Sequence, residues 1–485
     1  MKNRSDVGRG KRTIEGRATL GDALSVAAKK KLDELRSRLV DKAASAIQAM
    51  KQQPQPIWRS PSAKTEAVRR HVSINASNRV LAPSLVDKKP PPPRSGSGRG
   101  RGASVSQARP TYWTLPVGAV VRELPPQSVS PTNRTAVEET LRQATKPLSN
   151  SGQPLFAILG VDFGTSCTKV IARFPEEPGS PTVIVPSPIH CQSNGNPFLW
   201  QTVLWRRIDG TFIVWPEEGA VELRSLKQNL VAPSGLGSMD EGIVAAAAYV
   251  TFVIRHAIGW LLGSNAAQFR NRTPIWFVNV GLPAENYDNK LLLSAYRRAA
   301  ACGLQLAKAD LEVTLESVRV FMNHEAVLAA ANSKERAENL GVAVLPEVAA
   351  EVAGFARSVD RADGLYLMVD VGAMTLDVCA FNIVTRAGGG ERYAMFAAQV
   401  RHLGVEAQHW YLSERRSGAE FQWQCDQCVR EVVWDTKRVK EPTAARWRAG
   451  QQLPVFLAGG GAPNEVHSRV VRDLGPWLRT YTGND

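Results

Sequence analysis

The sequence has few cysteines and no long uninterrupted apolar run. Six cysteines among 485 residues are too few for a disulfide scaffold, and they fit a protein of the reducing cytoplasm. The basic residues 1–12 are not followed by the apolar core of a secretory signal. The longest apolar stretch, residues 243–262, is interrupted by Arg255 and His256, which favours a buried helix over a membrane span.

Patterns of metal-binding cysteine and histidine are equally scarce. Cys425 and Cys428 form one CxxC pair, and the only nearby histidines are His402 and His409. A structural zinc ion takes four ligands. The pair is therefore interpreted as two separate thiols, with a zinc site as the alternative.

Acidic residues are depleted in the first 150 positions. That stretch has 28 Lys and Arg but 11 Asp and Glu, a net charge of +17, whereas residues 151–485 have 32 basic and 34 acidic residues. Residues 1–150 predict a basic, Pro- and Gly-rich, mostly disordered extension, with an amphipathic helix near 19–51 and a short helix at 130–147. Through residues 1–110 it is a candidate binder of nucleic acid or an anionic membrane; a solubilising tail is the alternative.

The remaining chain alternates between strand and helix patterns, which predicts the α/β class. Strands are expected at residues 156–161, from 170, at 182–186, 198–205, 211–215, 275–280, 318–322 and 342–345, within 366–378, and from 454. Helices are expected at residues 240–263, 287–302 (ending at Gly303), 325–331, 346–357, 405–416 and 427–440, and after 461.

Three glycine-containing turns follow apolar strands. They read FAILGVDFGTSCTKVI at 156–171, YLMVDVGAMTLDV at 366–378 and VFLAGGGAP at 455–463. Glycine lets the backbone come close to a ligand, and the N–H and hydroxyl groups of such turns suit phosphate. Asp370 follows Asp162 by 208 positions, so a duplicated fold would bring both turns to one cleft.

Together these ordered motifs resemble the nucleotide-binding core of the actin/DnaK-type chaperone/sugar-kinase superfamily. The segments FVNVGLPAENYDNKLLLSAYRRAAACGL and RHLGVEAQHW are most similar to DnaK-type chaperones. The resemblance implies a duplicated actin-like (ribonuclease H-like) ATPase core whose two lobes, residues 151–365 and 366–485, surround a nucleotide cleft. The chain ends 24 residues after Gly461, so the second lobe is expected to be shortened, without a peptide-binding domain.

The resemblance also implies site residues and the cofactors ATP and Mg2+. Asp162 and Asp370 would hold Mg2+ through water, because bare carboxylates repel a triphosphate. Either Lys169 or Lys227 would neutralise the transferring phosphoryl group. The phosphate contacts and the backbone positions around them would be supplied by Gly164, Thr165, Ser166, Gly372 and Thr375.

The water-positioning residue and the adenosine pocket are implied in the same way. Glu347 lies 23 positions before Asp370 and Glu325 lies 45 before it; the shorter step resembles the family, so Glu347 is the candidate. The glycines Gly459, Gly460 and Gly461 would let adenine lie against the backbone. Lys437 would line the same pocket.

Three functions follow from the resemblance. The first is a cytoplasmic, DnaK-like Mg-dependent ATPase whose cleft closure is a switch for a protein partner. The second is an actin-like, self-assembling filament ATPase with a basic tail. The third is a nucleotide-binding scaffold that does not hydrolyse ATP.

Overall fold

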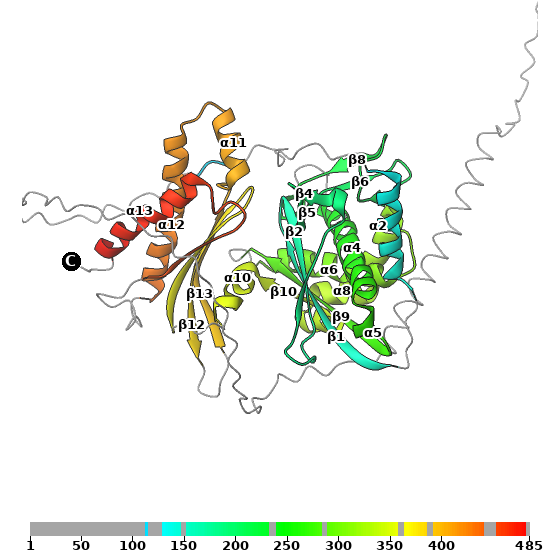
Figure 1. The fold of residues 1–485 in the computed structure, drawn as a ribbon. Helices are drawn as coiled ribbons and strands as arrows, with labels where there is room; N and C mark the ends of the chain where they lie inside the picture. Colours follow the sequence, from blue (N-terminus) through cyan, green and yellow to red (C-terminus); the bar gives the residue numbers. More distant parts are fainter. Residues whose placement is uncertain are drawn as a thin grey trace, which may run out of the picture.

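The computed structural model describes residues 112–114, 129–146, 152–231, 239–283, 289–356, 363–385, 391–440 and 453–481. The helix expected near residues 19–51 and the Pro- and Gly-rich stretch lie outside these ranges. The described part is mixed α/β and contains three sheets (Figure 1). We call the seven-stranded sheet with its helices (within residues 129–346) the first lobe, and the four-stranded sheet with its helices (within residues 364–481) the second lobe.

The first-lobe sheet is built around a hairpin. β1 (Gln153–Phe163) pairs antiparallel with β2 (Cys167–Arg173) and parallel with β9 (Arg272–Leu282), which pairs parallel with β10 (Val342–Pro346). Alternate residues of β1 are buried, as expected for a strand with one face on the core. The outer strands are β3 (Thr182–Val185), β4 (Gln192–Ser193) and β5 (Asn196–Gln201), with the 3-10 helix η1 (Ile189–Cys191) before β4. A small separate sheet has β6 (Leu204–Arg206), β7 (Phe212–Ile213) and β8 (Val221–Leu223).

Helices complete the first-lobe core. α4 (Met239–Ser264) packs along α6 (Lys290–Lys308). α4 is long and apolar enough to cross a membrane, but its apolar window is entirely buried in the protein; this confirms the prediction of a buried helix. The shorter helices are α3 (Leu226–Val231), α5 (Ala266–Phe269), α7 (Leu315–Met322), α8 (Glu325–Asn332) and α9 (Lys334–Asn339).

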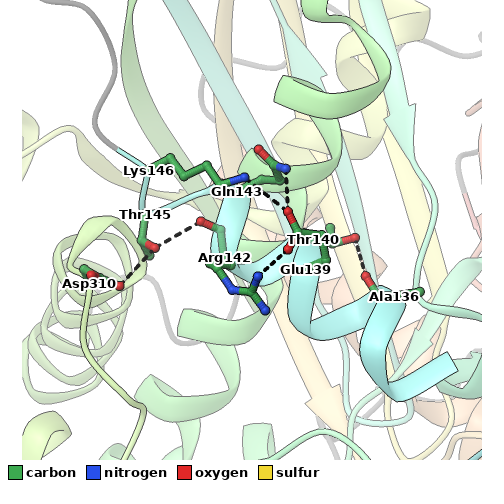
Figure 2. A network of polar contacts seen from close by, with 8 residues as sticks. All are labelled: Ala136, Glu139, Thr140, Arg142, Gln143, Thr145, Lys146 and Asp310. Atoms are coloured by element: carbon green, nitrogen blue, oxygen red, sulfur yellow. Dashed lines mark hydrogen bonds and ion pairs between the residues drawn. The ribbon is translucent and has the colours of Figure 1, made fainter. Parts of the chain in front are cut away.

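The first lobe also includes α2 (Pro131–Gln143), which confirms the short helix expected at 130–147. Its buried residues Val137 and Leu141 belong to the first-lobe core. It packs so closely on α4 that a Cβ at Gly259 would lie 1.8 Å from the Thr140 carbonyl oxygen. On its polar side, Glu139 accepts hydrogen bonds from neighbouring side chains (Figure 2). First-lobe packing therefore begins before residue 151.

The second-lobe sheet has the order β13-β12-β11-β14. β11 (Gly364–Val371) pairs antiparallel with β12 (Leu376–Thr385) and parallel with β14 (Val455–Ala458), and β13 (Glu391–Arg401) lies outside β12. One face packs against α11 (Val405–Ser413), α12 (Gly418–Lys440) and α13 (Glu465–Tyr481). The other face packs against α10 (Glu347–Ala356) through Val348 and Val352. Because α10 directly follows β10, it joins the two lobes (Figure 1).

Two predicted elements are wrong, and several elements were not predicted, among them β8, α3, α5 and α9. Residues 318–322 lie in helix α7, not in a strand, because Thr314 and Ser317 form a capping box that starts a helix there. Helix α6 does not end at Gly303. That glycine is buried within the helix, where a Cβ would lie 2.8 Å from Val250. Strand β13 was not predicted.

Candidate functional site

A cavity of about 450 Å³ lies between the two lobes. Its volume is typical of small-molecule sites. Both hairpin turns and the turn after β14 line it. Of the residues predicted from sequence, these line the cavity: Asp162, Gly164, Thr165, Ser166, Lys169, Lys227, Glu347, Asp370, Gly372, Thr375, Gly459, Gly460 and Gly461.

The two hairpin turns are tight because glycine occupies their first position. The Gly164 N–H donates to the Asp162 carbonyl at 3.1 Å, and a Cβ on Gly164 would lie 2.3 Å from the Cys167 carbonyl oxygen. In the second turn the Gly372 N–H donates to the Thr375 carbonyl at 2.9 Å. Both turns therefore place an aspartate at the end of a strand and a hydroxyl residue in the loop.

An ion pair lies at the mouth of the cavity. Asp162 and Lys169 are register partners on β1 and β2, and Lys169 Nζ lies 2.8 Å from Asp162 Oδ2. Their side chains are 49% and 50% exposed. Such an exposed pair contributes little to stability. Because about half of each side chain is exposed, both charges are accessible to a ligand.

A second ion pair lies deeper in the cavity. Lys227 Nζ on α3 lies 2.6 Å from Glu347 Oε1 at the start of α10, and both side chains are 13% exposed. Burial opposes charge on Lys227, but the adjacent Glu347 carboxylate, together with Tyr296 and Asp377, outweighs burial and raises the Lys227 pKa. Gly281 leaves room for this pair, because a Cβ there would lie 2.7 Å from Glu347 Cγ.

Sequence reasoning missed three carboxylates of the cavity, Glu351, Asp377 and Glu406. Glu351 follows Glu347 by one helical turn, a spacing that places both on one face of α10. Asp377 is the register partner of Asp370, and its Oδ1 is buried without a hydrogen-bond partner. Burial raises the Asp377 pKa well above its usual range. The i, i+4 spacing and the Asp that closes the second motif were the available signals.

The donor set of the cavity suits a hard cation. Six carboxylates line the cavity together with two lysines; they belong to Asp162, Glu347, Glu351, Asp370, Asp377 and Glu406. Mg2+ prefers carboxylate and water oxygens. Burial, with the neighbouring Asp162 charge, raises the Asp370 pKa. Among the described residues, no group of three or more Asp, Glu, His or Cys side chains is arranged to hold a metal directly.

The glycines after β14 have different surroundings. Gly459 has φ +86°, and a Cβ there would lie 2.1 Å from Asp370 Oδ1. A Cβ at Gly461 would lie 2.6 Å from Val371 and Val405 side-chain atoms, whereas at Gly460 it would meet nothing within 4 Å. Gly459 and Gly461 are therefore required for packing, and Gly460 borders open space in the cavity.

The other candidates lie elsewhere. Lys437 is on α12 and is not among the residues that line the cavity. Glu325 is in the first turn of α8, also away from it. Cys425 and Cys428 are fully buried in the second-lobe core among apolar side chains.

The carboxylate cluster predicts how stability depends on pH in metal-free buffer. Burial, followed by the Asp370 charge, raises the Glu351 pKa from 4.5 to about 9. The folded protein thus binds more protons than the unfolded chain between these values, and stability falls as pH rises through the window. Glu351 is exposed at the cavity, so solvent screening reduces the loss to about 1–2 kcal/mol between pH 5 and pH 9.

Urea unfolding at several pH values measures this dependence. Glu351→Gln should make the curve less steep, because it removes one of the carboxylates whose pKa is raised in the folded protein; Asp370 and Asp377 account for the remaining slope. Glu325→Gln on α8 is the matched control and should leave the curve unchanged. A wild-type protein whose stability rises from pH 5 to pH 9 would contradict the expectation.

Comparison with known proteins adds no relative: no protein-family model matches the chain, and no curated protein matches it.

Proposed function

We propose that the protein is an actin/DnaK-like ATP-binding switch. It is a Mg-dependent ATPase whose two lobes close on the nucleotide, and a protein partner responds to this closure. The single observation that carries the proposal is the shared cavity. Two D-x-G hairpins, 208 positions apart, and a triple-glycine turn that follows the second hairpin by 89 positions line one space that also contains two lysines. Three unrelated loops would not be expected to place turns suited to phosphate binding in the same cavity.

The sheet topology supports the proposed relationship. In each lobe, the leading strand of the hairpin pairs antiparallel with the next strand and parallel with a strand that arrives later, β9 for β1 and β14 for β11. A duplicated core would have this repeated pattern. The second sheet, among the described residues, has no counterpart of β10, in keeping with a shortened second lobe.

The cavity residues predicted from the sequence have the following roles in this proposal. Backbone N–H groups and hydroxyls of Thr165, Ser166 and Thr375 bind phosphate oxygens. Lys169, half exposed at the mouth, exchanges its Asp162 partner for phosphate. Glu347, oriented by Lys227, positions the attacking water. Mg2+ bound near Asp162 and Asp370 would neutralise phosphate charge.

ATP turnover by the full chain tests the proposal. Asp162→Asn should reduce turnover at least about 100-fold, because it removes one of the two carboxylates near which Mg2+ would neutralise phosphate charge. Glu222→Gln, on β8 outside the cavity, is the matched control and should retain wild-type turnover.

The other outcomes are informative. Wild-type protein that binds ATP without hydrolysing it would establish the nucleotide-binding scaffold instead. ATP-dependent pelleting would establish the filament-forming alternative. Absence of ATP binding to the wild type would refute all three functions.

A further inference from the structure

Residues 112–114, far from the second lobe in sequence, lie within it. Trp113 is 7% exposed and belongs to the second-lobe core, although 250 residues separate it from β11. Figure 1 shows this short segment beside α11. Residues 129–144 of the same extension pack in the first lobe. The extension is therefore attached to both lobes by separate contacts.

The contacts of Trp113 form a defined site. Its backbone N–H donates to Gln424 Oε1 at 2.9 Å, and its indole N–H donates to Glu414 Oε2 at 3.1 Å. Its ring packs edge-on against Tyr411, with centroids 5.4 Å apart. Gln424 also donates to the Tyr411 hydroxyl at 3.3 Å. Trp113 is thus held by an edge-on ring contact, one side-chain hydrogen bond and one backbone hydrogen bond.

Tyr112 adds a second anchor. The Arg401 guanidinium lies 5.0 Å from the centre of its ring, a cation–π distance. Burial, followed by the nearby Cys428 and Glu431, raises the Tyr112 pKa, which keeps its hydroxyl neutral. The site therefore recognises a Tyr-Trp pair, which we call the aromatic pair.

Helix α11 connects this site to the cavity. Its first residues, Val405 and Glu406, line the cavity, and their N–H groups donate to the carbonyls of Gly372 and Ala373 at 3.2 and 2.7 Å. Its other end carries Tyr411, and Glu414 caps it. The nine-residue helix spans about 13 Å at 1.5 Å per residue. A shift of α11 therefore moves the turn at 372–375 and the Trp113 site together.

A second chain of contacts joins the Trp113 site to another part of the cavity, the glycine turn after β14. Tyr411 packs on Phe421, and Phe421 packs on His467. His467 Nδ1 lies 2.9 Å from Asn464 Oδ1, and the Asn464 N–H donates to the Gly461 carbonyl at 2.8 Å. Both routes run through groups that are buried or hydrogen-bonded.

We propose that the aromatic pair at residues 112–113 is an internal ligand of the second lobe, coupled through α11 to the turn at 372–375 of the cavity. When the pair occupies the site, the hydrogen bonds between the start of α11 and that turn are more stable than when the site is empty. By reciprocity, a ligand in the cavity changes the affinity of the site for the pair by the same factor. The nature of that ligand rests on the proposed function, but the coupling itself does not.

Hydrogen exchange on the full chain tests the coupling without any nucleotide. Trp113→Ala should raise exchange of the Gly404, Val405 and Glu406 amides roughly tenfold, because typical couplings are of this size. Trp423→Ala, at a 49% exposed tryptophan on α12, is the matched control and should leave these amides unchanged. A synthetic peptide of residues 105–119 added to the Trp113→Ala variant should restore protection.

Two further measurements complete the test. Trp113→Phe keeps an aromatic ring and loses the indole N–H donor. Exchange of the same three amides should therefore lie between that of the wild type and that of Trp113→Ala. ATP affinity of the Trp113→Ala variant should change at least fivefold. If the wild type binds no ATP, the proposed function fails while the exchange result still decides the coupling.

The inference is overturned by any of three results. These are unchanged exchange at the three amides, a rise spread equally over β12 and α13 that indicates general unfolding, and failure of the peptide to restore protection.

Discussion

Lys227→Met is expected to destabilise the protein by about 3 kcal/mol and to abolish ATP turnover. The substitution removes the partner of Glu347, which lies 2.6 Å away in a pair whose side chains are 13% exposed. Loss of one partner from a buried pair leaves the other charge without compensation, which typically costs 3–5 kcal/mol; partial exposure places this pair near the lower end. Urea unfolding measures the loss.

The two ion pairs of the cavity supply the control. Lys169→Met removes a partner at similar distance, 2.8 Å, but from a half-exposed pair; its loss should be below about 1 kcal/mol. The double variant Lys227→Met/Glu347→Gln should regain part of the stability, since no charge is then unpaired, but no turnover. Equal destabilisation by Lys227→Met and Lys169→Met would contradict the role of burial.

Gly459→Ala is expected to destabilise the second lobe by about 3 kcal/mol and to eliminate nucleotide binding. The added Cβ would lie 2.1 Å from Asp370 Oδ1 and 2.4 Å from the Val371 carbonyl oxygen, at a φ of +86°. Overpacking costs 1–3 kcal/mol, and the positive φ adds about 1 kcal/mol for a residue with a Cβ. Asp370 must also move, so the cavity changes shape. Thermal unfolding and ATP titration measure the two effects.

Gly460→Ala separates packing from ligand contact. A Cβ at Gly460 meets nothing within 4 Å, so stability should stay within about 0.5 kcal/mol of wild type. If adenine lies against this turn, ATP affinity should nevertheless fall several-fold. Unchanged affinity in a stable Gly460→Ala protein would show that the base does not bind there, and an unaffected Gly459→Ala protein would contradict the steric expectation.

Local patterns predicted most of the strands and helices that form the cavity. Both hairpins were predicted because an apolar strand, a glycine turn and a second strand are encoded within about 16 residues. The long helix α4 was predicted from its apolar composition and its two internal polar residues. The errors arose where local patterns are ambiguous. The run at 318–322 is short, so periodicity alone does not distinguish strand from helix.

Tertiary packing decided the use of particular residues. Glycine often ends a helix, but Gly303 lies inside α6. It is glycine there because α4 approaches α6 too closely to leave room for a Cβ. Glu351 and Asp377 look like ordinary polar positions in their own elements. Glu351 on α10 and Asp377 on β12 join one carboxylate cluster only because α10 packs against the second-lobe sheet. Trp113 lies in a Pro-rich stretch that resembles a connector, and α11 and α12 make it a core residue.

The sequence by itself determined the α/β class, the two aspartate hairpins, the glycine turn and the concentration of positive charge in the first 150 positions. These depend on residue type and on spacing along the chain, which govern turns and strand or helix periods. Tertiary structure alone decided that Lys227 pairs with Glu347 across 120 positions and Trp113 with Gln424 across 311. Such contacts depend on the path of the whole chain, because burial and charge pairing act between groups in space regardless of their separation in sequence.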